Sequence, residues 1–155
     1  MSSAASMCEP VCMTVKPTYD DVNLILRLYE TRREEKMRAG REWFAQNFKY
    51  RTMEEFNRGC PPGSSMNAYA RMVMGYWEMV ASFISSGVLN QELFFQSGME
   101  LLFVWVRVRE LIPHMREANK NPGSFQNLET VANAYIKWLD QHSPEAYAAF
   151  AARIG

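Results

Sequence analysis

Apolar side chains recur at steps of three and four residues along most of this chain, and this spacing places them on one face of an α-helix. The first such stretch contains no proline from residue 20 to residue 47. Thr18 and Asp21 have the spacing of a capping box, which satisfies free N–H groups in a first helical turn. The sequence therefore predicts one long helix over 20–47. Its inward positions are expected to be Val22, Ile25, Leu26, Tyr29, Trp43 and Phe44.

Start and stop signals divide the rest of the chain into further helices. Thr52 and Glu55 form a second capping-box pattern, ahead of a short helix that ends at Gly59. Residues 59–65 hold two prolines and two glycines, which are not helical, and a serine then caps a helix over about 65–86. The solvent side of that helix is expected to carry Arg71, Met74, Glu78 and Ser82.

Three more helices are predicted in the second half of the chain. One runs from Asn90 to about Ile112, and the proline at 113 either ends or kinks it. Another begins at Ser124, and a short one follows Pro144, since proline suits a first helical position. No segment alternates strictly between apolar and polar residues as a half-buried strand would.

The predicted fold class is therefore all-α. We expect a bundle of four to five main helices, antiparallel because the connections are short. Residues 1–17 contain prolines and small polar residues and are expected to form a non-helical lead segment, and residues 18–155 a single helical domain.

Charge bears on the partners of this domain. The 155 residues contain 17 basic and 17 acidic side chains, so the net charge is zero. This balance gives no electrostatic attraction to nucleic acid or to an anionic membrane. It also removes the repulsion that keeps many proteins monomeric, so a homo-oligomer is expected.

The middle of the chain is poor in charge. Residues 59–106 hold four charged side chains, namely Arg71, Glu78, Glu92 and Glu100. We infer that the two middle helices are the most enclosed elements, or that they carry a buried protein interface.

Cysteine usage and targeting signals indicate a cytoplasmic protein. Cys8, Cys12 and Cys60 are too few and too irregular for a disulfide framework. His114 and His142 have no second ligand at zinc spacing, so no metal is expected. The N-terminus lacks a secretory pattern, and the most apolar run, 101–106, is too short to cross a membrane.

The predicted first helix is rich in basic residues, as a nucleic-acid-binding helix would be. The same segment also carries acidic residues, with Glu34–Arg38 and Arg38–Glu42 at the i,i+4 spacing of helix ion pairs. A phosphate-binding face would exclude those acids, so a solvated face is the preferred interpretation.

Two arginines and one glycine break the helical pattern. Arg33 falls on the apolar stripe of the first helix together with Lys36, and Arg109 falls on the stripe of Trp105. A buried guanidinium needs a partner, so each arginine is expected to extend to water, to pair with a carboxylate or helix end, or to bind an anionic ligand. Gly98 in mid-helix indicates the close approach of a neighbouring helix or of a ligand. Arg109, Arg33, Trp105 and Gly98 are therefore the candidate binding residues.

Catalytic motifs are absent from the sequence. It contains no nucleophile elbow, zinc-protease motif or phosphate-binding loop, and neither histidine follows a glutamate at the spacing of di-iron bundles. No catalytic residue and no cofactor are predicted, and the sequence favours a protein that is not an enzyme. The aromatic side chains fit an ordinary core better than a ligand pocket.

One resemblance adds to this picture. Landmarks at 24–33, Arg41–Phe44, Gly75–Val80 and Trp105–Pro113 resemble a bacterial family of small all-helical proteins of unknown function, over roughly residues 20–120. The resemblance implies a helical domain and brings no activity, cofactor or site residue.

Three functional hypotheses follow. The first is a non-enzymatic helical module that binds protein partners, above all copies of itself. The second is a sensor that binds a small anionic or apolar molecule within the bundle, near Arg109 and Trp105. The third is an enzyme of an uncharacterised kind.

Overall fold

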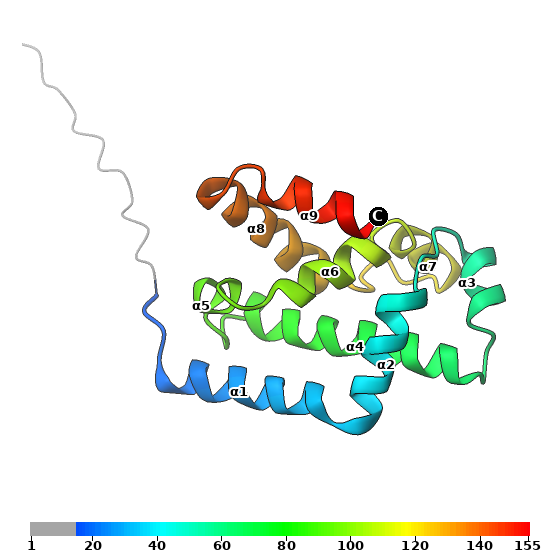
Figure 1. Ribbon diagram of the computed structural model, residues 1–155, viewed down its shortest axis with the longest axis horizontal. Coiled ribbons are helices and arrows are strands. Elements are labelled where there is room, and N and C mark those ends of the chain that lie inside the picture. The colour runs from blue at the N-terminus through cyan, green and yellow to red at the C-terminus, as the bar shows by residue number, and fades with distance from the viewer. Residues whose placement is uncertain (1–14) are drawn as a thin grey trace, which may run out of the picture.

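The computed structural model describes residues 15–155, and every regular element in that range is an α-helix (Figure 1). The all-α prediction is confirmed for these residues. Residues 15–18 precede the first helix, and the rest of the predicted lead segment, 1–14, lies outside the described residues. The helices are α1 Tyr19–Arg33, α2 Glu35–Asn47, α3 Met53–Gly59, α4 Ser65–Ser85, α5 Gln91–Phe95, α6 Met99–Val108, α7 Ile112–Ala118, α8 Gln126–His142 and α9 Ala146–Ile154.

The helices are arranged in layers around α4 and α6. Helices α1 and α2 cover one side, and α8 and α9 lie on the other (Figure 1). Helix α4 is in contact with α2, α6 and α8, so it is buried around most of its circumference. Met74, expected on the solvent side, is instead buried because a second layer of helices covers that face. The inference that a charge-poor middle helix is enclosed is correct for α4.

Several predicted helix starts are confirmed. Thr18 and Thr52 both form reciprocal capping boxes, with Asp21 and Glu55 respectively. Ser64 caps α4, and Asn90 caps α5. Each cap satisfies N–H groups that a first helical turn leaves without partners.

The prediction of one continuous helix over 20–47 is wrong, because the chain turns at Glu34. This residue has an extended backbone (φ −58°, ψ 142°), and its carboxylate accepts a hydrogen bond from the Met37 N–H at the start of α2. Figure 1 shows α2 rising across α4 at an angle to α1. Neither proline nor glycine marks this break, so it could not be predicted from residue types alone. Helix faces assigned by counting continuously through residues 20–47 are therefore wrong after Glu34, because α2 does not continue the rotation of α1.

The predicted helix over 90–112 is also interrupted. Residues 96–98 separate α5 from α6, and α7 then begins at Ile112 with Pro113 in its first turn. Proline is compatible with that position because a first-turn N–H needs no helical partner. The chain therefore remains helical beyond Pro113, as a new helix.

Helix α1 is held to the bundle by three anchors on one face. The Tyr76 hydroxyl of α4 donates a hydrogen bond to the Leu28 carbonyl at 2.7 Å, and Leu28 is itself buried. The Asp21 carboxylate accepts hydrogen bonds from the backbone N–H groups of Thr18 and Asn90, both at 2.7 Å. Arg32 supplies the third anchor, in an ion pair described below.

Another face of α1 is not covered by any other segment of residues 15–155, and here the expected orientation of Val22, Leu26 and Tyr29 is wrong. Their side chains are 43%, 55% and 52% exposed. The residues that turn inward are Leu28 and, in part, Leu24 and Ile25. Helix α1 has apolar residues around much of its circumference, so the pattern alone could not show which of them faces the bundle.

Candidate functional site

Two guanidinium groups meet one carboxylate where α1, α2 and α6 come together. Arg41 forms a bidentate contact with Glu100, with Nε–Oε1 at 2.6 Å and Nη2–Oε2 at 2.7 Å. The Arg32 Nη1 lies 3.0 Å from Glu100 Oε2. The side chains of this triad retain 17–29% exposure, so it is partly shielded from water.

The triad is also tied to the backbone and to aromatic rings. Arg41 Nη1 donates to the Arg32 carbonyl at 3.0 Å, so all of its guanidinium nitrogens have partners. The hydrogen bonds to Glu100 raise the pKa of Arg41 above its ordinary value. The Arg32 guanidinium lies 5.1 Å from the Tyr29 ring centre and 5.4 Å from that of Trp77. With two cations and one anion, the triad keeps one net positive charge.

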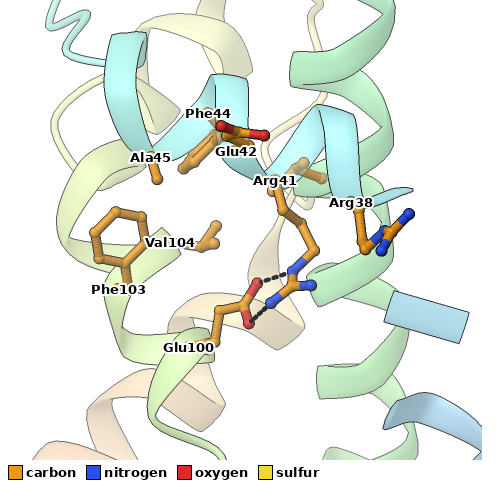
Figure 2. Close-up of a pocket in the computed structure, with 9 residues that line it drawn as sticks. Arg38, Arg41, Glu42, Phe44, Ala45, Glu100, Phe103 and Val104 are labelled. Atoms are coloured by element: carbon orange, nitrogen blue, oxygen red, sulfur yellow. Dashed lines mark hydrogen bonds and ion pairs between the residues drawn. The ribbon is translucent and has the colours of Figure 1, made fainter. Parts of the chain in front are cut away.

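Beside the triad lies a surface groove of about 480 Å³ between α2 and α6, which we call the α2–α6 groove. Figure 2 shows Arg41 reaching from α2 to Glu100 on α6 at one end of it, and Phe103 and Val104 along one side. The lining residues are Arg38, Arg41, Glu42, Phe44, Ala45, Val73, Glu100, Phe103 and Val104. Phe44, Val73 and Val104 are buried and provide an apolar floor.

The chemistry of this groove favours binding over proton transfer. Glu100 accepts three hydrogen bonds from two guanidinium groups, so most of its acceptor positions are occupied. Within residues 15–155, no cluster of three His, Cys, Asp or Glu side chains could hold a metal ion. The apolar floor and the positive end can accommodate the apolar part of a molecule that carries a negative charge.

A second feature is a row of exposed apolar side chains along the outer face of α1. Tyr19, Val22, Leu26 and Tyr29 follow one another at steps of three, four and three residues. Tyr19 is 89% exposed, and the other three are between 43% and 55% exposed. We call these four residues the α1 stripe. Arg33 continues the row one turn later, with its guanidinium 5.9 Å from the Tyr29 ring centre.

Comparison with known proteins places this architecture in a family. A family model described as a domain of unknown function (DUF4760) matches residues 17–138, which include α1 to most of α8. The chain belongs to the DUF4760 family. No curated protein and no solved structure matches the chain. The expected resemblance to a family of unknown function is thus confirmed. No helix in residues 15–155 is long and apolar enough to span a membrane.

The four predicted site residues do not form one site in this DUF4760 domain. Arg109 is the C-cap residue of α6, and its exposed guanidinium donates a hydrogen bond to the Tyr147 hydroxyl at 3.0 Å. Trp105 is buried in the core, and Arg33 is exposed on the last turn of α1. Arg33 shares the row of Val22 and Tyr29 as expected, but that row is exposed and not buried. Arg109 follows Trp105 by one turn as expected, but it lies at the C-terminal end of α6, where its side chain is exposed.

Arg109 instead lines a separate surface cavity of about 360 Å³ near the C-terminal end of α6. Lys49, Arg51 and Arg107 also line it, together with Glu55 and Glu110. Arg51 pairs with Glu110 at 3.3 Å, and Arg107 donates to the Phe48 carbonyl at 2.9 Å. An anion-binding role for Arg109 stays a prediction.

Gly98 does not lie in mid-helix as expected, but is the N-cap residue of α6. The close approach inferred from the glycine does occur, and it comes from the preceding short helix. A Cβ at position 98 would lie 2.3 Å from the Phe94 ring of α5. Gly98 therefore allows a tight turn between α5 and α6, and its neighbour is a side chain of the same chain.

Glu100, Arg32 and Arg41 were not singled out as site residues from the sequence. Glu100 stands directly before the apolar run 101–106, and an isolated carboxylate at the edge of such a run needs a partner. That signal points to Glu100. Its partners could not be chosen among six basic residues of 27–41 until the break at Glu34 was known.

Proposed function

We propose that this DUF4760 domain is a non-enzymatic protein-interaction module that self-associates through the α1 stripe. The observation that carries the proposal is the regular exposure of Tyr19, Val22, Leu26 and Tyr29 on one helix face. Contiguous apolar patches on a protein surface commonly mark sites of protein contact. A helix face with this spacing suits a groove or another helix as its partner.

The anchoring of α1 supports this proposal. Leu28, Asp21 and Arg32 hold the helix from a different face, so α1 is presented in a fixed orientation. A pre-ordered helix loses less conformational entropy on binding than a flexible segment would. On this proposal the Arg32–Glu100–Arg41 triad has a positioning role: it keeps the last turn of α1 against α6.

The zero net charge supports self-association as the form of this interaction. Two copies meet without long-range repulsion, and each brings the same apolar stripe. Closed symmetric dimers are the commonest assemblies of soluble proteins, and they use one patch on both subunits.

Sedimentation equilibrium tests the proposal over a wide range of protein concentration. Wild-type protein is expected to form dimers as the concentration rises, and Leu26→Glu to weaken this association by about tenfold or more, which corresponds to about 1.4 kcal/mol. Met79→Glu is the matched control, because Met79 is similarly exposed, at 41%, but belongs to α4 and not to α1. Circular dichroism checks that both variants remain folded. A monomeric wild type, or equal dimerisation of Leu26→Glu and wild type, would overturn the proposal.

The α2–α6 groove favours a second candidate function, the binding of a small amphipathic anion. The supporting observation is a cavity of about 480 Å³ with an apolar floor beside a triad of net positive charge. This site differs from the one expected near Trp105 and Arg109, since Trp105 is buried and Arg109 lies on another surface.

Calorimetric titration with decanoate tests this second candidate. Ala45→Trp is expected to abolish binding, because Ala45 is exposed and lines the groove. Ala149→Trp, at an exposed position on α9, is the control and should bind like wild type. If wild type does not bind decanoate, or if Ala45→Trp binds equally well, the groove is not a site for this ligand class.

A further inference from the structure

Building on the proposed self-association, we infer that two copies pair through antiparallel α1 helices, with Leu26 of each copy on the two-fold axis. The exposure of the α1 stripe alone does not specify the orientation or the register of the partner helix.

The spacing of the stripe residues along α1 determines which residues of the two copies face each other. Tyr19 and Arg33 stand seven residues on either side of Leu26, and Val22 and Tyr29 stand four and three residues away. A two-fold rotation about an axis through Leu26 therefore places the stripe of the second copy against the stripe of the first. Tyr19 of one copy then lies opposite Arg33 of the other, and Val22 lies within one residue, about 1.5 Å along the axis, of the level of Tyr29. An interface that is its own complement in this way is the requirement for a two-fold dimer.

The charges at the two ends of α1 favour one orientation of the partner helix. The exposed charges at its ends are Asp20 in the first turn and Arg33 in the last turn, whereas Asp21 and Arg32 are held by partners within the domain. An antiparallel pair sets the acidic end of one helix beside the basic end of the other, and it also opposes the two helix dipoles. A parallel pair would place like ends together. Antiparallel pairing is therefore the favourable choice on electrostatic grounds.

Aromatic contacts reinforce the same arrangement. The Arg33 guanidinium already lies near the Tyr29 ring of its own helix. In the antiparallel pair, the highly exposed Tyr19 ring of the partner lies at the same level as Arg33. A cation between two aromatic rings gains from both of them. This contact gives the most exposed side chain of the stripe a specific role.

The stripe is short, and this limits the strength of the dimer. From Tyr19 to Arg33 the helix rises by about 21 Å, at 1.5 Å per residue. A single pair of such helices falls at the small end of specific interfaces. We therefore expect a dimer that dissociates on dilution.

Disulfide trapping tests the register. Cys8 and Cys12 are changed to serine, and Cys60 is retained because it is fully buried. Single cysteines are then placed at 22, 26 or 29 and oxidised at a concentration where sedimentation shows dimers. Leu26→Cys is expected to form a covalent dimer several-fold faster than Val22→Cys or Tyr29→Cys alone. A mixture of Val22→Cys and Tyr29→Cys is expected to form the mixed dimer. Met79→Cys on α4 is the control for collisional oxidation.

The outcomes separate this inference from the proposed function. If Val22→Cys and Tyr29→Cys each cross-link alone as fast as Leu26→Cys, the helices are parallel and the inference is wrong, while self-association through α1 stands. If dimers form but no stripe position cross-links faster than Met79→Cys, both the register and the use of α1 are wrong. If sedimentation shows only monomers, the proposed function fails before the register is tested.

Discussion

Arg41 and Glu100 are 59 residues apart in the sequence, and their side chains form a bidentate contact that joins α2 to α6. Arg32 brings α1 into the same contact. One carboxylate thus fixes three helices, and it lies at one end of the α2–α6 groove. The orientation of the α1 stripe and the shape of the groove both depend on this contact.

Glu100→Gln is predicted to destabilise the fold, because two guanidinium groups would lose their counter-charge in a partly buried place. Fully buried pairs lose about 3–5 kcal/mol when one partner is removed, and the partial exposure here lowers the expected loss to about 2 kcal/mol. Urea denaturation measures this change. Glu110→Gln is the matched control, because Glu110 and its partner Arg51 are 51% and 70% exposed. Exposed pairs contribute little, so this control should change stability by less than about 0.5 kcal/mol. Equal losses in the two variants would show that the triad has no special role.

Two buried tyrosines predict a loss of stability in alkaline solution. Burial raises the pKa of Tyr76 and of Tyr135 to about 12. In the unfolded chain each phenol ionises near pH 10, so from about pH 10 to 12 the unfolded state loses protons that the folded state keeps. Stability is therefore unaffected below pH 10 and falls above it, by up to about 1.4 kcal/mol per pH unit for each tyrosine.

Urea midpoints measured at several alkaline pH values check this prediction. The double variant Tyr76→Phe, Tyr135→Phe should be less stable at neutral pH, because both hydroxyls donate to backbone carbonyls. Its stability should nevertheless decline less steeply above pH 10. Tyr19→Phe, at an exposed position, is the control and should keep the wild-type slope. An unchanged slope in the double variant would contradict the assignment.

Asp21 predicts the opposite behaviour in acid. Hydrogen bonds from the backbone of Thr18 and of Asn90 lower the pKa of its carboxyl below the ordinary value. The stabilisation is present above the pKa of the unfolded chain, near 4, and is lost as pH falls through the lower folded value. Asp21→Asn should therefore be less stable than wild type at neutral pH, and the difference should shrink below about pH 4. Asp20→Asn, exposed on the same turn, controls for the change in helix charge. A difference that does not vary with pH would show that Asp21 acts through packing alone.

The sequence was most informative where local chemistry decides the structure. The capping boxes at Thr18 and Thr52 and the serine cap before α4 depend on side chains that lie within three residues of their partners. Local spacing is sufficient to predict such features. The all-α class followed from the same local patterns.

The missing features depend on contacts between distant segments. The break at Glu34 is stabilised by an ordinary carboxylate cap, and nothing in the composition of 30–38 distinguishes it from a continuous helix. The choice of Arg32 and Arg41 over Arg33 as partners of Glu100 depends on that break. Likewise, the inward turn of Leu28 and the outward turn of Leu26 depend on where α4 lies. Periodicity shows that a helix has faces, and only tertiary packing selects the buried one.

Gly98 and Gly75 predict opposite effects of the same substitution. A Cβ at position 98 would lie 2.3–2.8 Å from atoms of the Phe94 ring. That ring is buried and packs edge-on against Trp77, so it cannot move aside without disturbing the core. Gly98→Ala should therefore destabilise the domain by about 1–3 kcal/mol, the usual effect of overpacking. Gly75 lies in the middle of α4, is exposed and has no neighbour within 4 Å of its added Cβ.

Gly75→Ala should accordingly stabilise the domain, by up to about 1 kcal/mol, because alanine favours the helix and meets no obstacle. Urea denaturation of the two single variants gives both signs in one experiment. Phe94→Leu combined with Gly98→Ala separates the clash from a backbone effect, since a smaller side chain at 94 would leave room for the new methyl group. Gly98→Ala should then destabilise the domain less in the Phe94→Leu background than in the wild-type background. If it costs the same in both backgrounds, the glycine is required by the backbone of the α5–α6 turn rather than by the Phe94 ring.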